Sequence, residues 1–164
     1  MMRNMFGAIA MIAAAGTAAA QQGELGIPVG SPAPAAVVQT LDGKDANLSA
    51  YIGKGPVVIE FWATWCENCR ALEPQLMSLV KQYAGTVQFV GVAVSANESA
   101  ARVKAYATKH AFTHAIFYDT HGLATGAYDV PATSYVVVMN KAGVIVYTGV
   151  GGDQDLAAAI KKAL

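Results

Sequence analysis

The chain is poor in charged residues and has no basic cluster, and both features exclude some classes of protein. Charged residues make up 13% of the 164 positions and hydrophobic residues 54%, which argues against a disordered or fibrous chain. Eleven basic residues balance eleven acidic ones, so nothing favours a nucleic acid as partner. No internal repeat is present, and the length suits a single packed domain.

Cysteine is equally scarce. Cys66 and Cys69 are the only two in the chain, and only two residues separate them in the stretch WATWCENC. A disulfide between them closes a loop too small to constrain the fold, whereas the framework disulfides of exported proteins join several well-separated cysteines. The pair is therefore predicted to carry out chemistry and not to staple the structure.

The first twenty residues have the pattern of a secretory signal. One basic residue, Arg3, precedes an apolar run over 5–15 and small residues at 18–20 that suit a cleavage site. A helix that spans a membrane needs about 20 apolar residues, and this run is shorter. We therefore expect the signal to be cleaved and the mature chain to have no membrane span. No cysteine follows the site, which argues against a lipid anchor. Without Arg3 the chain has 10 basic and 11 acidic residues, hence a charge of −1, and we expect it to be periplasmic or otherwise exported.

Residues 21–35 are rich in glycine and proline and are predicted to form a flexible arm ahead of a domain at 36–164. Within that domain Asp42-Gly43 marks a hairpin turn, and the apolar run 56–63 suits a buried parallel strand. The spacing of the remaining apolar residues predicts helices over 68–83, 95–110 and 153–164, strands over 86–94 and 115–119, and a hairpin about 140–143. Ser95 and Glu98 form the pattern of a capping box for the second helix, and Asp153 is the expected cap of the last one. This alternation predicts a mixed α/β sheet of about five strands with helices on both faces.

The two cysteines lie where a strand passes into a helix, which suggests their chemistry. Backbone N–H groups and the helix dipole stabilise a thiolate at a helix N-terminus, so Cys66 is predicted to be the attacking sulfur. Cys69 lies one turn further along and can resolve a mixed disulfide. Cys-x-x-Cys is also half of many zinc sites, but roughly forty residues separate Cys69 from the nearest pair, His110 and His114. We expect no metal, and no cofactor other than a redox-active disulfide.

The stretch VVIEFWATWCENC resembles the active-site strand and turn of thioredoxin-like proteins. The wider pattern LDGKDANLSAYIGKGPVVIEFWATWC, with Pro74 five residues after the second cysteine and the late YDV…MNKAGVIVYTGVGG, is similar to the exported TlpA and ResA branch over residues 30–164. The resemblance implies a thioredoxin fold with an extra N-terminal β-hairpin. It also implies disulfide exchange with exported proteins, sometimes apocytochromes c, and a membrane thiol protein as electron donor.

Glu60 is a charged residue inside an otherwise apolar strand, six residues before Cys66. Thioredoxins carry a buried aspartate at this position, and strand periodicity points Glu60 the same way as Trp62 and away from Phe61. Desolvation should raise the pKa of this carboxyl group, which makes it a candidate general acid and base for Cys69. The alternative is a structural ion pair with a lysine at the sheet margin.

Three residues beside the cysteines are candidates for tuning the site. Glu67 opposes thiolate formation at Cys66 and so favours a more reducing couple, unless it is a solvated charge of little weight. Asn68 adds no compensating charge, and Trp65 shapes an apolar rim for substrates. These features predict a reductant of partner disulfides, with a disulfide oxidase or a copper-binding chaperone of thioredoxin fold as alternatives.

The chain departs from the resemblance in the loop that faces the cysteines. TlpA-like proteins carry Tyr-x-Val-x-Ala-Thr-Pro there, with the proline in cis, and the letters YDVPATS place Ser134 after Thr133 at that position. Using Pro131 instead requires a three-residue shift in the following strand, and it stays an alternative. A cis bond before a residue other than proline costs about 2.5–4 kcal/mol, so the Thr133–Ser134 bond is expected to be trans.

Overall fold

The computed structural model describes residues 25–164, so the predicted signal at 1–20 lies outside the described residues. Within the described range, no helix combines the length and the apolar character needed to cross a bilayer. The elements in chain order are β1 (Val37–Thr40), β2 (Asp45–Asn47), the short 3₁₀ helix η1 (Leu48–Ala50), β3 (Val57–Trp62), α1 (Glu67–Gln82), β4 (Gln88–Val94), α2 (Ala100–Lys109), β5 (Ala115–Asp119), α3 (Leu123–Ala127), β6 (Tyr135–Met139), β7 (Ile145–Val150) and α4 (Leu156–Lys161).

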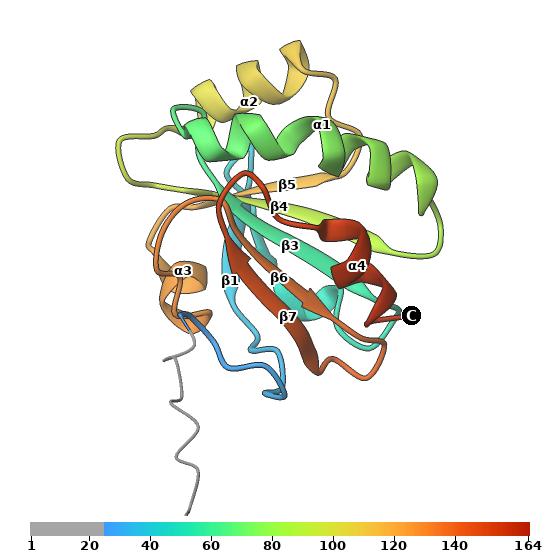
Figure 1. The fold of residues 1–164 in the computed structure, drawn as a ribbon. Coiled ribbons are helices and arrows are strands. Elements are labelled where there is room, and N and C mark those ends of the chain that lie inside the picture. The colour runs from blue at the N-terminus through green and yellow to red at the C-terminus, as the bar shows by residue number, and fades with distance from the viewer. Residues whose placement is uncertain (1–24) are drawn as a thin grey trace, which may run out of the picture.

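The strands form one mixed sheet in the order β2-β1-β5-β4-β3-β6-β7. β3 lies inside it, parallel to β4 and antiparallel to β6. The predicted mixed sheet with helices on both faces is confirmed. The sheet has seven strands where about five were expected, because β1 pairs with β5 and the N-terminal β1–β2 hairpin thereby extends the sheet (Figure 1).

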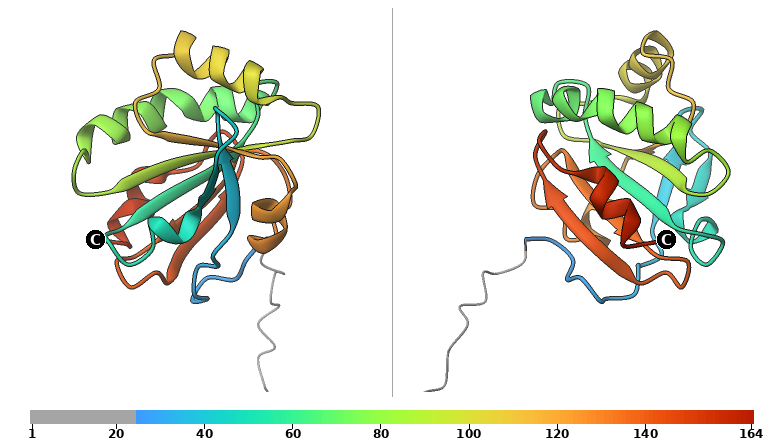
Figure 2. Two further views of the ribbon diagram at one scale, coloured as in Figure 1. Left: turned by 180° about the vertical axis from the view of Figure 1, so that it is seen from behind. Right: turned by 45° about the vertical axis from the view of Figure 1, so that its right-hand side comes forward.

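Alternate residues of β3 enter two different cores. Val58 packs beneath α1 and α4 with Leu72 and Leu76. Phe61 points to the other face, where its ring centroid lies 5.4 Å from that of Tyr128, next to α3. Figures 1 and 2 show α1 and α4 covering one face of the sheet and α3 lying against the other. β3 is therefore buried on both sides, as its nearly continuous apolar sequence predicts.

The residues ahead of β1 run beside the β6–β7 hairpin. The N–H of Gly30 donates to the carbonyl of Ile145, and the N–H of Ile145 donates to the carbonyl of Ser31. The N–H of Ile27 donates to the Tyr135 hydroxyl at 3.0 Å. The part of the predicted arm that the structure describes therefore follows a hydrogen-bonded path onto the domain.

The predicted start of α2 is wrong. Ser95 does not cap a helix; α2 is capped by Ser99, whose side chain accepts the N–H of Arg102. The reason is a long-range interaction, because the carboxylate of Glu98 accepts two hydrogen bonds from Thr64 and does not fold back on Ser95. The loop after β4 is consequently four residues longer than a capping box at Ser95 would give.

The terminal helix is also shorter than predicted. Its cap is Asp155, whose side chain accepts the N–H of Ala158 at 2.9 Å, and not Asp153. The residue between them, Gln154, is buried and donates its side-chain amide to the carbonyls of Ser134 and Gly151. These contacts hold the chain away from helical geometry until Asp155.

Candidate active site

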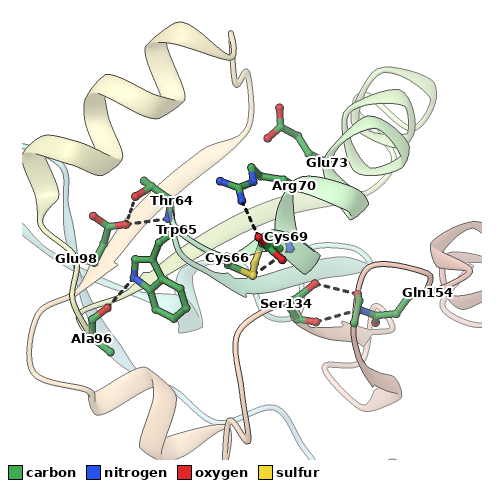
Figure 3. Close-up of a disulfide and its surroundings, with 12 residues drawn as sticks. Thr64, Trp65, Cys66, Cys69, Arg70, Glu73, Ala96, Glu98, Ser134 and Gln154 are labelled. Carbon is green, nitrogen blue, oxygen red and sulfur yellow. Dashed lines mark hydrogen bonds and ion pairs between the residues drawn. A yellow bond between two sulfur atoms is a disulfide. The ribbon is translucent and has the colours of Figure 1, made fainter.

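A disulfide joins Cys66 and Cys69 at the turn between β3 and α1 (Figure 3). Cys66 is the N-cap of α1 with extended backbone, and its Sγ accepts the N–H of Cys69 at 3.0 Å. The N–H of Cys66 donates to the carbonyl of Ala63 at 3.1 Å, which closes the turn. A thiolate at Cys66 would therefore face a backbone donor and the positive end of a 16-residue helix, whereas Cys69 lies inside the first turn.

Glu60 lies on β3 opposite Gly91 of β4 and Val136 of β6, and it is buried. One of its carboxylate oxygens has no hydrogen-bond partner among the described residues, and no lysine forms an ion pair with it there. Burial raises the pKa of Glu60 to about 8, and the negative charge of Glu73 adds to the shift. The structure thus gives the lysine alternative no support and places a proton-binding carboxyl group in the middle of the sheet.

Glu73 is a charged residue that no sequence motif singled out. It lies on α1 one turn beyond Cys69, and its carboxylate accepts the Tyr106 hydroxyl at 2.9 Å and contacts Nδ1 of His110 at 2.7 Å. The Tyr106 ring also packs against Trp62, the neighbour of Glu60 on the same face of β3, with centroids 5.5 Å apart. The i,i+4 spacing from Cys69 was the available signal, because that spacing puts two side chains on one helix face.

The tuning residues next to the cysteines lie at the surface. The side chain of Glu67 is 92% exposed, and its carboxylate lies 3.8 Å from the guanidinium of Arg70, which is half exposed. Water screens such a charge strongly. The exposed position therefore favours the expectation that Glu67 is a solvated charge with little effect on the Cys66 thiolate. Asn68 is exposed as well, and its backbone lies against Gly152 in the loop between β7 and α4.

Ser134 lies beside the disulfide in Figure 3, immediately before β6. It is fully buried and has a positive φ of 60°, and its hydroxyl donates to the carbonyl of Gly151 at 2.9 Å. The side chain of Gln154 donates to the Ser134 carbonyl at 3.0 Å. No peptide bond in the described part of the chain is cis, and Thr133 and the exposed Pro131 precede this anchored position.

The segment on the other side of the disulfide is tied to the loop between β4 and α2. Trp65 is 45% exposed, and its indole N–H donates to the carbonyl of Ala96 at 2.9 Å (Figure 3). Thr64 donates both its N–H and its hydroxyl to Glu98. The parallel pairing of β3 and β4 was the signal for this contact, since the residues that follow two parallel strands meet at one edge of the sheet.

The histidines considered as metal ligands lie apart from any suitable cluster. Nδ1 of His110 is occupied by Glu73, and His114 is partly buried, which lowers its pKa to about 4 although the charge of Glu73 acts in the opposite direction. Across residues 25–164 no three histidine, cysteine or acidic side chains are grouped so that they could hold an ion.

Comparisons with known proteins show which sequences this chain resembles. The sequence profile of the Redoxin family matches residues 28–164. The chain is 35% identical over 123 residues to the thioredoxin-like protein YneN of Bacillus subtilis (strain 168), covering 74% of this chain and 71% of that protein. It is 31% identical over 135 residues to the thiol-disulfide oxidoreductase ResA of Geobacillus thermodenitrificans (strain NG80-2), covering 79% and 75%.

The fold is also similar to solved structures. A thiol:disulfide interchange protein of the thioredoxin family from Chlorobium tepidum TLS superposes with a TM-score of 0.70 at 25% identity, covering 84% of this chain and 98% of the other. The predicted thioredoxin fold with an added N-terminal hairpin is thereby confirmed.

Proposed function

Because this chain belongs to the Redoxin family and is a thiol–disulfide oxidoreductase of the TlpA and ResA type, we propose that it reduces disulfides in exported partner proteins. The observation that carries the proposal is the position of Cys66, whose Sγ caps α1 and accepts the N–H of Cys69. A sulfur so placed is stabilised as a thiolate, and the second sulfur follows within one helical turn.

Exchange proceeds in two steps that move two electrons. The Cys66 thiolate attacks one sulfur of a partner disulfide, which forms a mixed disulfide and releases the partner's other sulfur as a thiolate. Cys69 then attacks Sγ of Cys66, and the second partner sulfur leaves as a thiolate. The partner ends reduced, and this chain ends with the Cys66–Cys69 disulfide.

Glu60 supplies the proton transfer in the second step. Its carboxylate accepts the proton of the Cys69 thiol as that sulfur attacks, and the protonated acid returns the proton when the disulfide is reduced again. A pKa of about 8 supports this role, because both protonation states are then populated near neutral pH.

Sequence features support the proposed direction of exchange and the proposed compartment. Residues 1–20 direct export, and a membrane thiol protein re-reduces the disulfide after each turnover. Partners include apocytochromes c, which the resemblance to the TlpA and ResA branch implies. The acidic Glu67 beside Cys66 works in the reducing direction, although its exposure limits the contribution.

A trapping experiment tests the proposal. Cys69→Ser should accumulate a mixed disulfide between Cys66 and exported partner proteins, because the resolving sulfur is absent. Cys66→Ser is the matched control and should trap no partner through the attacking position. Equal trapping by both variants, or capture of cytosolic proteins alone, would contradict the assigned order of sulfurs or the exported location.

A further inference from the structure

Glu98 is a charged residue with no exposed side-chain surface, and every acceptor position on it is used. Oε2 accepts the N–H of Thr64 at 2.8 Å and its hydroxyl at 2.6 Å. Oε1 accepts the N–H of Ser99 at 2.9 Å and Nε of Arg102 at 3.0 Å. Burial alone would raise the pKa of Glu98, but the hydrogen bonds outweigh burial and keep the pKa below its usual value. The carboxylate therefore joins the turn that carries the cysteines to the start of α2.

The loop over residues 95–99 is held at further points. The guanidinium of Arg102 donates to the carbonyl of Asn97, a residue other than glycine with a positive φ of 51°. The Tyr118 hydroxyl donates to the Glu98 carbonyl at 3.0 Å. Asparagine adopts this left-handed conformation more readily than most residues, which suits the turn that the N–H of Glu98 closes on the carbonyl of Ser95. The loop is therefore a fixed platform, and its Ala96 carbonyl accepts the indole N–H of Trp65 at 2.9 Å.

We propose that Glu98 is a positioning residue for disulfide exchange. By fastening residues 95–99 to Thr64 it fixes Trp65, directly before Cys66, as a rigid wall of the surface on which a partner protein docks. This inference rests on the proposed function, since it concerns protein partners. A large aromatic side chain contributes most to an interface when it is already ordered, because binding then costs no further conformational entropy.

Two variants loosen the contact in different ways. Glu98→Gln places an amide N–H₂ where a carboxylate oxygen accepts two donors, so one oxygen's hydrogen bonds are lost. Thr64→Val removes only the hydroxyl donor and keeps side-chain shape and the backbone N–H, so it decides the question if Glu98→Gln fails to fold. The matched control is Asp119→Asn, which makes the same carboxylate-to-amide change at another buried acid, one that accepts the N–H groups of Ala124 and Thr125 at the start of α3.

The first readout is acrylamide quenching of tryptophan fluorescence. The chain has two tryptophans, and Trp62 is only 3% exposed, so quenching reports Trp65. Glu98→Gln and Thr64→Val should raise the quenching constant, because the indole leaves the Ala96 carbonyl. Asp119→Asn should leave it at the wild-type value.

The second readout is the split between KM and kcat for reduction of a protein disulfide, with insulin as the probe. Glu98→Gln should raise KM by up to about tenfold, because Trp65 must then be ordered when the partner binds, while its rate with the small disulfide DTNB stays close to wild type. Unchanged quenching together with a KM equal to that of Asp119→Asn would overturn the inference. A wild-type protein that reduces DTNB but not insulin would instead contradict the proposed function, and the quenching result would still decide the role of Glu98.

Discussion

Glu60 binds a proton more tightly in the folded protein than in the unfolded chain. Its pKa rises from 4.5 to about 8, so between these values the folded state holds the extra proton and stability falls as pH rises. Glu60→Gln removes this titration. The variant should be stabilised relative to wild type near about pH 9 and much less near about pH 4, with a difference in slope of up to about 1.4 kcal/mol per pH unit between them. Urea unfolding across this pH range measures the effect, and parallel wild-type and variant curves would show that Glu60 is not perturbed.

Glu73 should set the pH at which Glu60 changes protonation. Its charge contributes to the raised pKa of Glu60, so Glu73→Gln should lower that pKa and move the corresponding inflection of kcat to lower pH. The groups around Glu73 are the Tyr106 hydroxyl and His110, both of which contact its carboxylate.

The matched control for this experiment is Glu67→Gln. It removes the same charge from the same helix, but at a side chain that water surrounds. Profiles of kcat against pH should show the shift in Glu73→Gln and not in Glu67→Gln. An inflection that moves equally in both variants would indicate a general effect of net charge.

The contact between α1 and the loop after β7 depends on a glycine. A Cβ at Gly152 would lie 2.7 Å from Cβ of Ala71 and 2.9 Å from the carbonyl oxygen of Asn68, in the first turns of the helix that carries the cysteines. Gly152→Ala should therefore destabilise the protein by about 1–3 kcal/mol, since one of the two elements must move.

Gly126→Ala is the control for the loop substitution. Gly126 lies in α3, and among the described residues no atom outside its chain neighbours and the backbone of its own helix lies within 4 Å of the position that its Cβ would occupy. This variant should be neutral or more stable by about 0.5–1 kcal/mol, because alanine is the better helix former. Denaturant midpoints measure both effects. Equal losses of stability in the two variants would contradict the claim that a Cβ at Gly152 crowds α1.

The elements that the sequence predicted correctly are those that local patterns determine. Asp42-Gly43 sets a hairpin turn within a few residues, and the apolar run of β3 needs only burial on both faces. The predicted starts of α2 and α4 were wrong because contacts with distant residues determine them. Glu98 accepts hydrogen bonds from Thr64, 34 residues away, and Gln154 donates to the carbonyl of Ser134, 20 residues away. No local pattern contains such contacts.

The whole molecule brings three separate segments around the two sulfurs. Parallel pairing of β3 with β4 places the loop over 95–99 at the same edge as Cys66. Antiparallel pairing of β3 with β6 brings Ser134 to that edge, and Gly152 follows from β7. The cysteine motif and Glu60 could be recognised from the sequence as chemically significant, and Ser134 through the family resemblance. The loop over 95–99 and Gly152 depend on the strand order and could not be recognised.

Measurement of the reduction potential of the Cys66–Cys69 couple tests the central claim most directly. The protein is equilibrated with thiol–disulfide buffers of known potential, and the fraction of free Cys66 thiol is followed by alkylation. A reductant should give a single two-electron transition closer to the about −270 mV of thioredoxin than to the about −120 mV of strong oxidants. A transition well above about −180 mV would make the protein a disulfide oxidase, and cysteines that never exchange with the buffer would contradict the account altogether.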